Sequence, residues 1–345
     1  MQTVFAGRLS VSGPSARGGY APGSDGMHPS GGKAAVWAIA GVVAVVLMAP
    51  NPAAARVRTL HLRYGPISMQ PAELKAHNTR VPPPRVNGFI TRMHAYVVDD
   101  RGRRLPTNEL MLHHAVFRKY IAPFWDADCS ARRDSEPFYA TGEENETLRL
   151  PPGYGLRVKR SDHWLVRWML MNHTDKRYKA YIRYDVRVDT SRAIVPVQAV
   201  WMRVVSCRNE YFDVPGDGGP GSVFQQSRQI PVTRTGRVVV ATGHLHGGAI
   251  SLALSEPRCG NRILVSTQPV YRSGAPRPTD GPVHVTSFTS PVGIPLFRGQ
   301  SVVLTASYDN SAPHDEVMGT MHLYVAAGRP AAYDCGPLPP NVALP

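Results

Sequence analysis

The sequence predicts an all-β protein built from two jelly-roll-like antiparallel β-sandwich domains. Proline and glycine are both frequent, with 32 and 31 residues in a chain of 345. The apolar runs between them are short, and many are rich in Val, Ile, Tyr and Trp or alternate with polar residues. Such runs, bounded by turn residues, indicate many strands and no long helices. The length is sufficient for two domains of ordinary size.

Residues 1–55 are expected to be an N-terminal extension that lies outside the fold. Within it, residues 34–48 form an uncharged apolar run that follows Lys33 and precedes three alanines at 53–55. This run is short for a membrane span, and its flanks are those of a secretory signal with a small-residue cleavage site. A retained membrane anchor is the alternative. Met27 is an alternative start to Met1, because a signal beginning there has an ordinary basic leader.

The first β-sandwich domain is predicted over residues 56–215. Turn sequences such as PPPR, DDRGRR and PPGYG separate its candidate strands. These strands are predicted at 57–64, 88–98, 110–119, 163–171, 179–188 and 195–205. The polar, acidic segment 128–148 is expected to be an exposed loop.

A linker is predicted over 216–230, because the sequence VPGDGGPGS at 214–222 cannot pack into a core. The second β-sandwich domain then covers 231–345. Its strands are predicted at 236–255, 262–271, 283–288, 301–308 and 317–326.

Charge and cysteine content indicate an exported protein that does not bind nucleic acid. The net charge is +14, but the arginines are scattered among apolar residues and form no dense basic run. None of the four cysteines belongs to a CxxC pair, and an even count in an exported chain favours two disulfides. Three connectivities are open, of which Cys129–Cys207 with Cys259–Cys335 keeps each bridge within one half of the chain. We expect a secreted or cell-envelope monomer that contacts membrane only through 34–48, if that segment is retained.

The most specific local motif is His244-Leu245-His246. It follows a run of valines, and residues i and i+2 of a strand project from the same face. The two imidazoles would therefore lie side by side, with the glycines that follow allowing another group to approach. Met318, at the start of a late strand in the same half, would complete a His-His-Met metal site. His314 is a second candidate there, with a turn residue as the alternative interpretation.

A second candidate site centres on His113 and His114. Neighbouring residues of a regular strand face opposite ways, so both can bind one ion only if the backbone bulges or bends. Candidates for a third ligand are His163, Met169, Met171 and His173, which share one face of a continuous strand. Imidazole together with thioether sulfur suits copper, because sulfur is soft and Cu(I) is a soft ion.

The sequence carries no motif for other kinds of catalytic chemistry. The sequence has no nucleophile elbow of the GxSxG type, no P-loop and no dinucleotide-binding glycine pattern. Nothing marks a pair of carboxylates for glycoside hydrolysis either.

At these residues the chain resembles two related groups. The stretches MHAYVVDDRGRRLPTNELMLHHAVF, GHLHGGAISLAL, STQPVY and SYDNSAPHDEVMGTMHLYV, spread over residues 58–328, are similar to the stress up-regulated Nod family. More distantly, the chain resembles the copper type II, ascorbate-dependent monooxygenases, such as peptidylglycine hydroxylating monooxygenase. That resemblance implies two jelly-roll domains and two separated coppers. It assigns His113 and His114 to the electron-donating copper, and His244, His246 and Met318 to the oxygen-activating copper.

Two positions depart from the monooxygenase pattern. The third histidine of the first site corresponds to Met169 when the sequences are aligned on Asn172. An arginine that the peptide-amidating enzymes carry two residues before the HxH motif is replaced by Thr242. Peptide amidation is therefore not carried over to this chain.

Two hypotheses of function follow. In the first, an exported protein binds one or two copper ions and hydroxylates a C–H bond of a small molecule or peptide, with ascorbate or another reductant. In the second, the protein is a non-catalytic copper-binding or structural component of the cell envelope. The missing third histidine and the lack of a recognisable substrate anchor favour the second.

Overall fold

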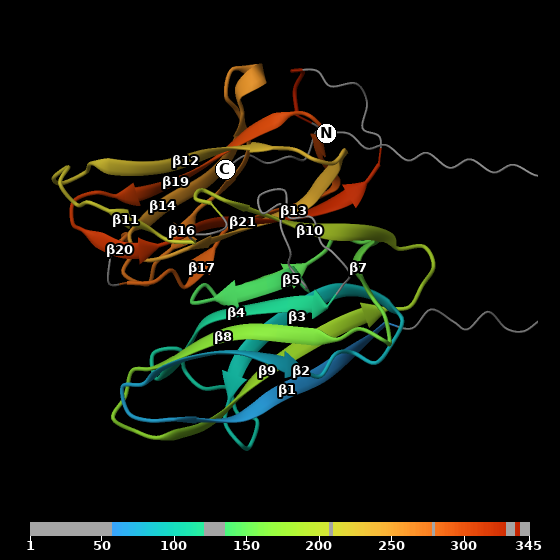
Figure 1. Cartoon of the computed structure of the whole chain (residues 1–345), viewed down its shortest axis with the longest axis vertical. Coiled ribbons are helices and arrows are strands. Elements are labelled where there is room, and N and C mark those ends of the chain that lie inside the picture. Colours follow the sequence, from blue (N-terminus) through green and yellow to red (C-terminus); the bar gives the residue numbers. More distant parts are fainter. Residues whose placement is uncertain (1–56, 121–134, 207–209, 278–279, 329–334, 339–345) are drawn as a thin grey trace, which may run out of the picture. The chain divides into compact units, whose positions relative to one another are not determined.

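The described chain consists almost entirely of antiparallel β-structure (Figure 1). The computed structural model describes residues 57–120, 135–206, 210–277, 280–328 and 335–338. The described helical structure is a single 3-10 turn, η1 (Pro257–Cys259). The all-β class predicted from short alternating runs is therefore confirmed.

One nine-stranded sheet extends through both halves of the chain. Its strand order is β1-β9-β3-β7-β10-β21-β13-β18, with β6 paired to β3. The bounds in chain order are β1 (Val57–Met69), β3 (Gly88–Val98), β6 (Thr147–Arg149), β7 (Tyr154–Val158), β9 (Tyr178–Asp189), β10 (Val195–Arg203), β13 (Gly236–Leu245), β18 (Ser287–Leu296) and β21 (Gly319–Ala327). Strand β10 joins the halves, because it pairs in parallel with β7 and antiparallel with β21.

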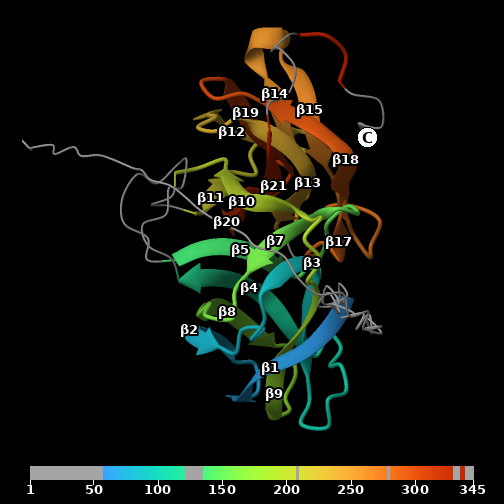
Figure 2. The same ribbon diagram turned by 90° about the vertical axis from the view of Figure 1, so that its right-hand side faces the viewer.

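A four-stranded sheet packs against each half of this long sheet (Figure 2). The first has the order β2-β8-β4-β5, with bounds β2 (Leu74–Val81), β4 (Leu110–Tyr120), β5 (Ser135–Gly142) and β8 (Trp164–Asn172). The second has the order β12-β19-β14-β15, with bounds β12 (Val223–Pro231), β14 (Ala249–Glu256), β15 (Arg262–Thr267) and β19 (Ser301–Asp309). Two short ladders complete the described strands: β11 (Phe212–Val214) with β20 (His314–Val317), and β16 (Pro269–Val270) with β17 (His284–Val285).

Each sandwich has its own hydrophobic core. Strand β9 shows how the sequence builds the first core, because its alternate side chains Ala180, Ile182, Tyr184 and Val186 are fully buried. The residues between them are half-buried or exposed, as expected for a strand with one face on a core. The second core lies between β13, β21 and β18 on one side and the sheet of β12, β14, β15 and β19 on the other. Burying one large aliphatic side chain contributes roughly 1.5–3 kcal/mol.

Three sequence-based boundaries need correction. The predicted linker 216–230 is strand from Val223 onward, because its residues alternate and Ile230 reaches the second core. The predicted strand 236–255 is two strands, β13 and β14, since the glycines that follow the HxH motif form a turn. The predicted exposed loop 128–148 contains β5 and β6 from residue 135 onward. The described residues all belong to one compact unit, Pro52–Pro345.

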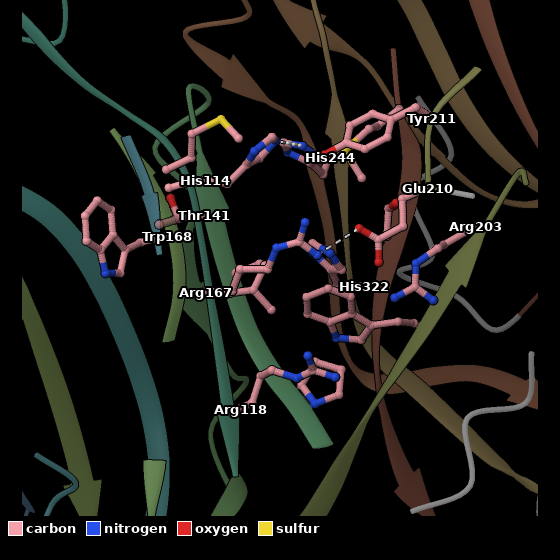
Figure 3. A pocket seen from close by; sticks show the side chains of 18 residues that line it. His114, Arg118, Thr141, Arg167, Trp168, Arg203, Glu210, Tyr211, His244 and His322 are labelled. Carbon is pink, nitrogen blue, oxygen red and sulfur yellow. Dashed lines mark hydrogen bonds and ion pairs between the residues drawn. The ribbon is translucent and has the colours of Figure 1, made fainter. Parts of the chain in front are cut away.

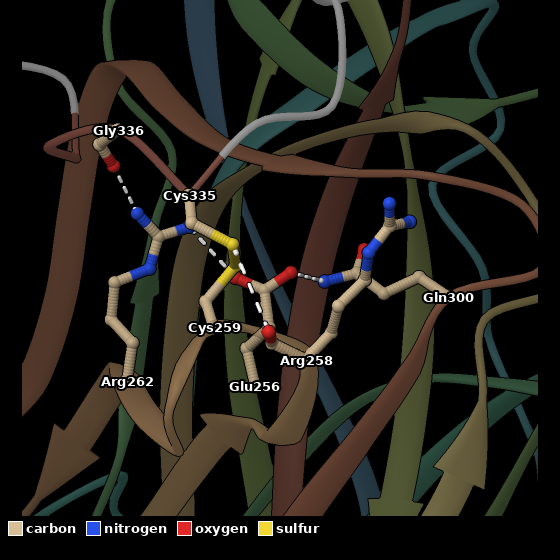
Figure 4. Close-up of a disulfide and its surroundings, with 7 residues drawn as sticks. All are labelled: Glu256, Arg258, Cys259, Arg262, Gln300, Cys335 and Gly336. Carbon is tan, nitrogen blue, oxygen red and sulfur yellow. Dashed lines mark hydrogen bonds and ion pairs between the residues drawn. A yellow bond between two sulfur atoms is a disulfide. The ribbon is translucent and has the colours of Figure 1, made fainter.

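A disulfide joins Cys259 to Cys335 across a sequence separation of 76 residues (Figure 4). Beside it, the buried carboxylate of Glu256 accepts hydrogen bonds from Arg262 at 2.7 Å and from Gln300 at 2.5 Å. This bridge was one of the two expected, and it is typical of an oxidising, extracellular environment. The other predicted pair, Cys129–Cys207, lies outside the described residues.

The predicted signal or anchor, residues 34–48, also lies outside the described residues. Among the residues that the structure describes, none lies in a helix capable of spanning a membrane.

Candidate metal centre

Four histidines from the two halves of the chain meet in one cluster. His113 and His114 come from β4, His244 from the end of β13, and His246 directly follows β13. The centres of neighbouring rings are 4.3–5.6 Å apart. The Nε2 atoms of His114 and His244 lie only 3.0 Å apart. One ligand atom from each of His114, His244 and His246 lies within 4.8 Å of the other two.

A β-bulge brings the two neighbouring histidines of β4 to one site. The register of β4 against β8 shifts between Leu112 and His114, and an extra residue in one strand re-aims the side chains that follow it. The rings of His113 and His114 are consequently stacked at 4.3 Å. This is the bulge that the sequence predicts if both histidines are to bind one ion.

Two buried tyrosines hold the backbone of the HxH motif. The Tyr308 hydroxyl accepts a hydrogen bond from His246 N at 3.1 Å and donates to Met318 O at 2.5 Å. The Tyr271 hydroxyl donates to Ala249 O at 2.9 Å, just beyond the motif. Because both tyrosines are buried, the position of His246 is fixed by the second core and not by a free loop.

A buried carboxylate orients His244. Both oxygens of Glu144 lie 3.2 Å from His244 Nδ1, and the Glu144 side chain is 2% exposed. A carboxylate at Nδ1 accepts the ring N–H, which leaves the lone pair on Nε2, the atom that faces His114. Gly142 makes this contact possible, because a Cβ there would lie 2.9 Å from Glu144 Oε2 and 3.1 Å from the His244 ring. The second carboxylate of the turn, Glu143, lies 3.2 Å from His113 Nδ1.

The electrostatics keep most of the cluster neutral. Burial, reinforced by the neighbouring imidazoles, lowers the pKa of His114 and His246 well below the ordinary value. Burial alone would also lower the pKa of His244, but the adjacent Glu144 raises it above the ordinary value. Burial and then Glu144 raise the pKa of Glu143 to about 7. Neutral imidazole is the form that binds metal.

The geometry of the cluster fits a metal ion. With metal–nitrogen distances of about 2.0–2.1 Å, two ligands of a tetrahedral site have their nitrogens about 3.3–3.4 Å apart. The nitrogens of His114, His244 and His246 span 3.0–4.8 Å, so small rotations of the rings would close the site. Within the described residues, the buried Nε2 of His246 has no hydrogen-bond partner. The chain therefore carries a candidate three-histidine metal site.

The two expected ligand sets are not separated in space. The resemblance assigns His113 and His114 to one copper, and His244 and His246 to another, but His114 and His246 each have all three other rings within 5.6 Å, centre to centre. The reason is that β10 makes the long sheet continuous, which brings the end of β13 beside β4. Met318 is 8% exposed and lines a pocket together with His114 and His244.

Except for His163, which is exposed just before β8, the remaining candidate ligands surround the cluster. Met169 is the cross-strand neighbour of His114, and it lines both the pocket with Met318 and an open cleft. The cleft is lined by the other candidates too: Met171, His173 and His314. His314 is half-buried, and burial lowers its pKa.

A pocket of about 780 Å³, open solvent included, adjoins the cluster (Figure 3). His114 and His244 form one part of its wall, and Trp201 and His322 form another, with ring centres 4.1 Å apart and planes tilted by 42°. Three arginines from three different strands also line it: Arg118, Arg167 and Arg203. Arg167 lies 3.6 Å from Glu210. The pocket thus combines aromatic surface with positive charge beside the candidate metal site.

Sequence reasoning missed Glu143, Glu144 and His322. The two glutamates lie in the turn after β5, which was expected to be exposed because it is rich in charge, although Glu144 is buried. The sequence signal that could have identified these glutamates is that the two follow each other directly after Gly142. His322, 3% exposed on β21, was hidden in an ordinary alternating strand.

Comparison with known proteins supports one family. Residues 159–328 match the model of the family described as Stress up-regulated Nod 19. This range runs from β8 to β21 and contains His244, His246 and Met318. The chain is thus similar to that family over about half of its length, and no curated protein matches the sequence.

The comparison with solved structures gives matches of low similarity. One is PNGase F, a glycosylasparaginase from Flavobacterium meningosepticum, with a TM-score of 0.39 and 8% identity over 77% of this chain and 96% of that chain. Another is PNGF-II, with a TM-score of 0.35 and 8% identity over 80% of this chain and 67% of that chain.

Proposed function

We propose that this protein is an exported copper-dependent oxidoreductase of the monooxygenase type. Its copper site would be formed by His114, His244 and His246, with His113 at its edge. The observation that carries the proposal is the convergence of three imidazole nitrogens within 4.8 Å, one of them oriented by the buried Glu144. A carboxylate behind a ligating histidine is a recurrent feature of metal sites.

The nature of the donors favours copper over zinc. Imidazole suits both ions, but thioether sulfur is a soft ligand that favours Cu(I). Met169 stands directly across from His114 in the sheet, and Met318 lines the same pocket as His114 and His244. When bound, copper would supply one-electron redox chemistry and activation of dioxygen. An external two-electron reductant such as ascorbate would balance insertion of one oxygen atom into a C–H bond, with the second oxygen released as water.

The chain's own residues would bind and orient the substrate. The pocket beside the cluster offers Trp201 as an apolar wall and Arg167 as a positively charged group. Nδ1 of His244 would keep its proton on the side of Glu144, so that Nε2 stays available as a ligand. His114 and His246 are half-buried and line the open cleft, through which a substrate and dioxygen could reach the site.

Metal titration tests the site. Purified full-length protein should bind copper tightly, and the single substitutions His114→Ala, His244→Ala and His246→Ala should each weaken binding at least tenfold. The matched control is His163→Ala, which removes an exposed histidine that lies just before β8. Copper binding unchanged in all three cluster variants would refute the three-histidine site.

Oxygen uptake separates a monooxygenase from a non-catalytic copper-binding protein of the cell envelope. The copper-loaded protein should consume oxygen with ascorbate and a substrate, and His244→Ala should abolish this consumption. Uptake no greater than that of free copper, across a broad panel of organic substrates, would leave copper binding intact but refute the catalytic part of the proposal.

A further inference from the structure

Three methionines lie together on the outer face of the β4–β8 strand pair. In β4, Met111 is half-buried while Leu110 and Leu112 point into the core. In β8, Met169 and Met171 are half-buried while the residue between them, Leu170, is fully buried. All three methionines line the open cleft that leads to the histidine cluster.

The strand register places the three thioethers within reach of one another. Met111 is the direct cross-strand partner of Met171, and Met169 is the partner of His114. Directly opposed residues have Cβ atoms about 4.5–5.5 Å apart, and residues i and i+2 of a strand share a face about 6.6 Å apart. The side chains of Met111, Met169 and Met171 therefore form a triangle small enough to close on one ion.

Core packing does not account for the position of the three methionines on the outer face of the strand pair. Methionine usually fills irregular gaps in hydrophobic cores, but here the core side of both strands is already occupied by leucines. The cleft on the methionine side is lined by apolar and charged residues together: Leu74, Pro282 and Val283 beside Glu143, Arg272, Asp280, Asp315 and Glu316. Half-buried methionines in such a mixed wall gain only part of the hydrophobic burial that a core provides, whereas their thioether sulfurs are soft metal ligands.

We propose that Met111, Met169 and Met171 form a second metal site, selective for Cu(I), at the mouth of the histidine cluster. His113 and the exposed His173 line the same cleft and are the available fourth ligands. Because Met169 also faces His114 across the strand pair, an ion held by the methionines lies next to the histidine site. The methionine site captures Cu(I) from solution and delivers it to the histidines. The delivery role rests on the proposed function, whereas the binding of a soft ion does not.

Soft-metal titration tests the binding. Anaerobic titration of the full-length protein with Cu(I), in competition with a Cu(I) chelator, should give two equivalents. The double substitution Met111→Leu with Met171→Leu, which nearly conserves volume, should leave one equivalent. His114→Ala with His246→Ala should also leave one, and the quadruple variant none. The matched control is Met93→Leu, a methionine fully buried in the first core, which should retain both.

A spectroscopic measurement on the unaltered protein covers the case of a variant that misfolds. With methionine methyl groups labelled with ¹³C, one equivalent of Ag(I) should shift the signals of Met111, Met169 and Met171 and leave that of Met93 unchanged. Two equivalents of Cu(I) retained by a folded Met111→Leu, Met171→Leu variant would overturn the proposal, as would unmoved methionine signals. Loss of one equivalent in that variant, with none lost in the histidine variants, would support the methionine site while refuting the histidine site.

Discussion

The Glu144 carboxylate is the most direct place to test how the cluster holds a metal, because it contacts a proposed ligand without being one. Replacing Glu144 with Gln keeps the size of the side chain but removes its charge. In the native protein both carboxylate oxygens lie 3.2 Å from His244 Nδ1. A glutamine offers one oxygen, and its amide group, if turned toward the ring, would donate to Nδ1 and favour the wrong tautomer.

The expected loss is a tenfold to hundredfold drop in copper affinity, the range typical when a residue that supports a metal ligand is removed. That range corresponds to about 1.4–2.7 kcal/mol. We expect a value near the upper end, because Glu144 is 2% exposed and His244 is 8% exposed, so that water does not replace the lost interaction well. Structural disturbance should be small, since glutamine and glutamate occupy nearly the same volume.

The assay is competition against a copper chelator of known affinity at pH 7.5, with unfolding midpoints measured for every variant. The matched control is Glu146→Gln, the same substitution at a residue of the same turn that is also buried. Its copper affinity should stay within about twofold of the native value. An equally small effect of Glu144→Gln, in a variant that remains folded, would refute the role of Glu144 in orienting His244.

Three further predictions concern the surroundings of the cluster. Gly142→Ala should weaken copper binding and also lower thermal stability, because a Cβ there would lie 2.7 Å from the backbone oxygen of His113, 2.9 Å from the Glu144 carboxylate and 3.1 Å from the His244 ring; parallel titration and melting curves would check this. Burial and the charge of Glu144 raise the pKa of Glu146 to about 8, so its contribution to stability is full at low pH and is lost as the pH rises to about 8. In urea unfolding of the metal-free proteins, the unfolding free energy of Glu146→Gln should therefore exceed that of the native protein by an amount that grows from pH 5 to pH 8. A difference that stays constant over this range would contradict the prediction. Replacing both cysteines of the Cys259–Cys335 disulfide with serine should cost about 4.5 kcal/mol of unfolding free energy in the chain-entropy treatment of a loop of this length, whereas a loss below about 1 kcal/mol would exclude that account.

Local patterns in the sequence predicted the strands well, because each depends on side chains only two residues apart. The alternation in 179–188 and 301–308 became β9 and β19 with one buried face each. The same logic predicted that His113 and His114 need a bulge to face one site, and the register of β4 shifts at that point. Strand β12 was missed because glycine and proline just before Val223 were interpreted as a longer linker.

The single cluster could not be predicted, because it depends on contacts far apart in sequence. Whether His114 meets His244 is decided by β10, which pairs with β7 on one side and with β21 on the other. No local pattern encodes such a pairing, and the resemblance to two-copper enzymes predicted separation instead. The supporting Glu144 was missed for a related reason: acidic residues in a turn are usually solvated, and burial of this one follows from its contact with a distant histidine.

The cost of the cluster without an ion is itself an argument for metal binding. Burying a polar group without a partner costs about 1–3 kcal/mol, and within the described residues His246 Nε2 is in that position. The 3.0 Å contact between the Nε2 atoms of His114 and His244 requires a neutral His114 to carry its proton on Nε2, so that in the metal-free protein each of these two nitrogens has only the other ring as its partner. Apolar side chains would join the two sandwiches at lower cost. A metal ion would satisfy all three nitrogens at once, and its ligands would then connect strands from both cores.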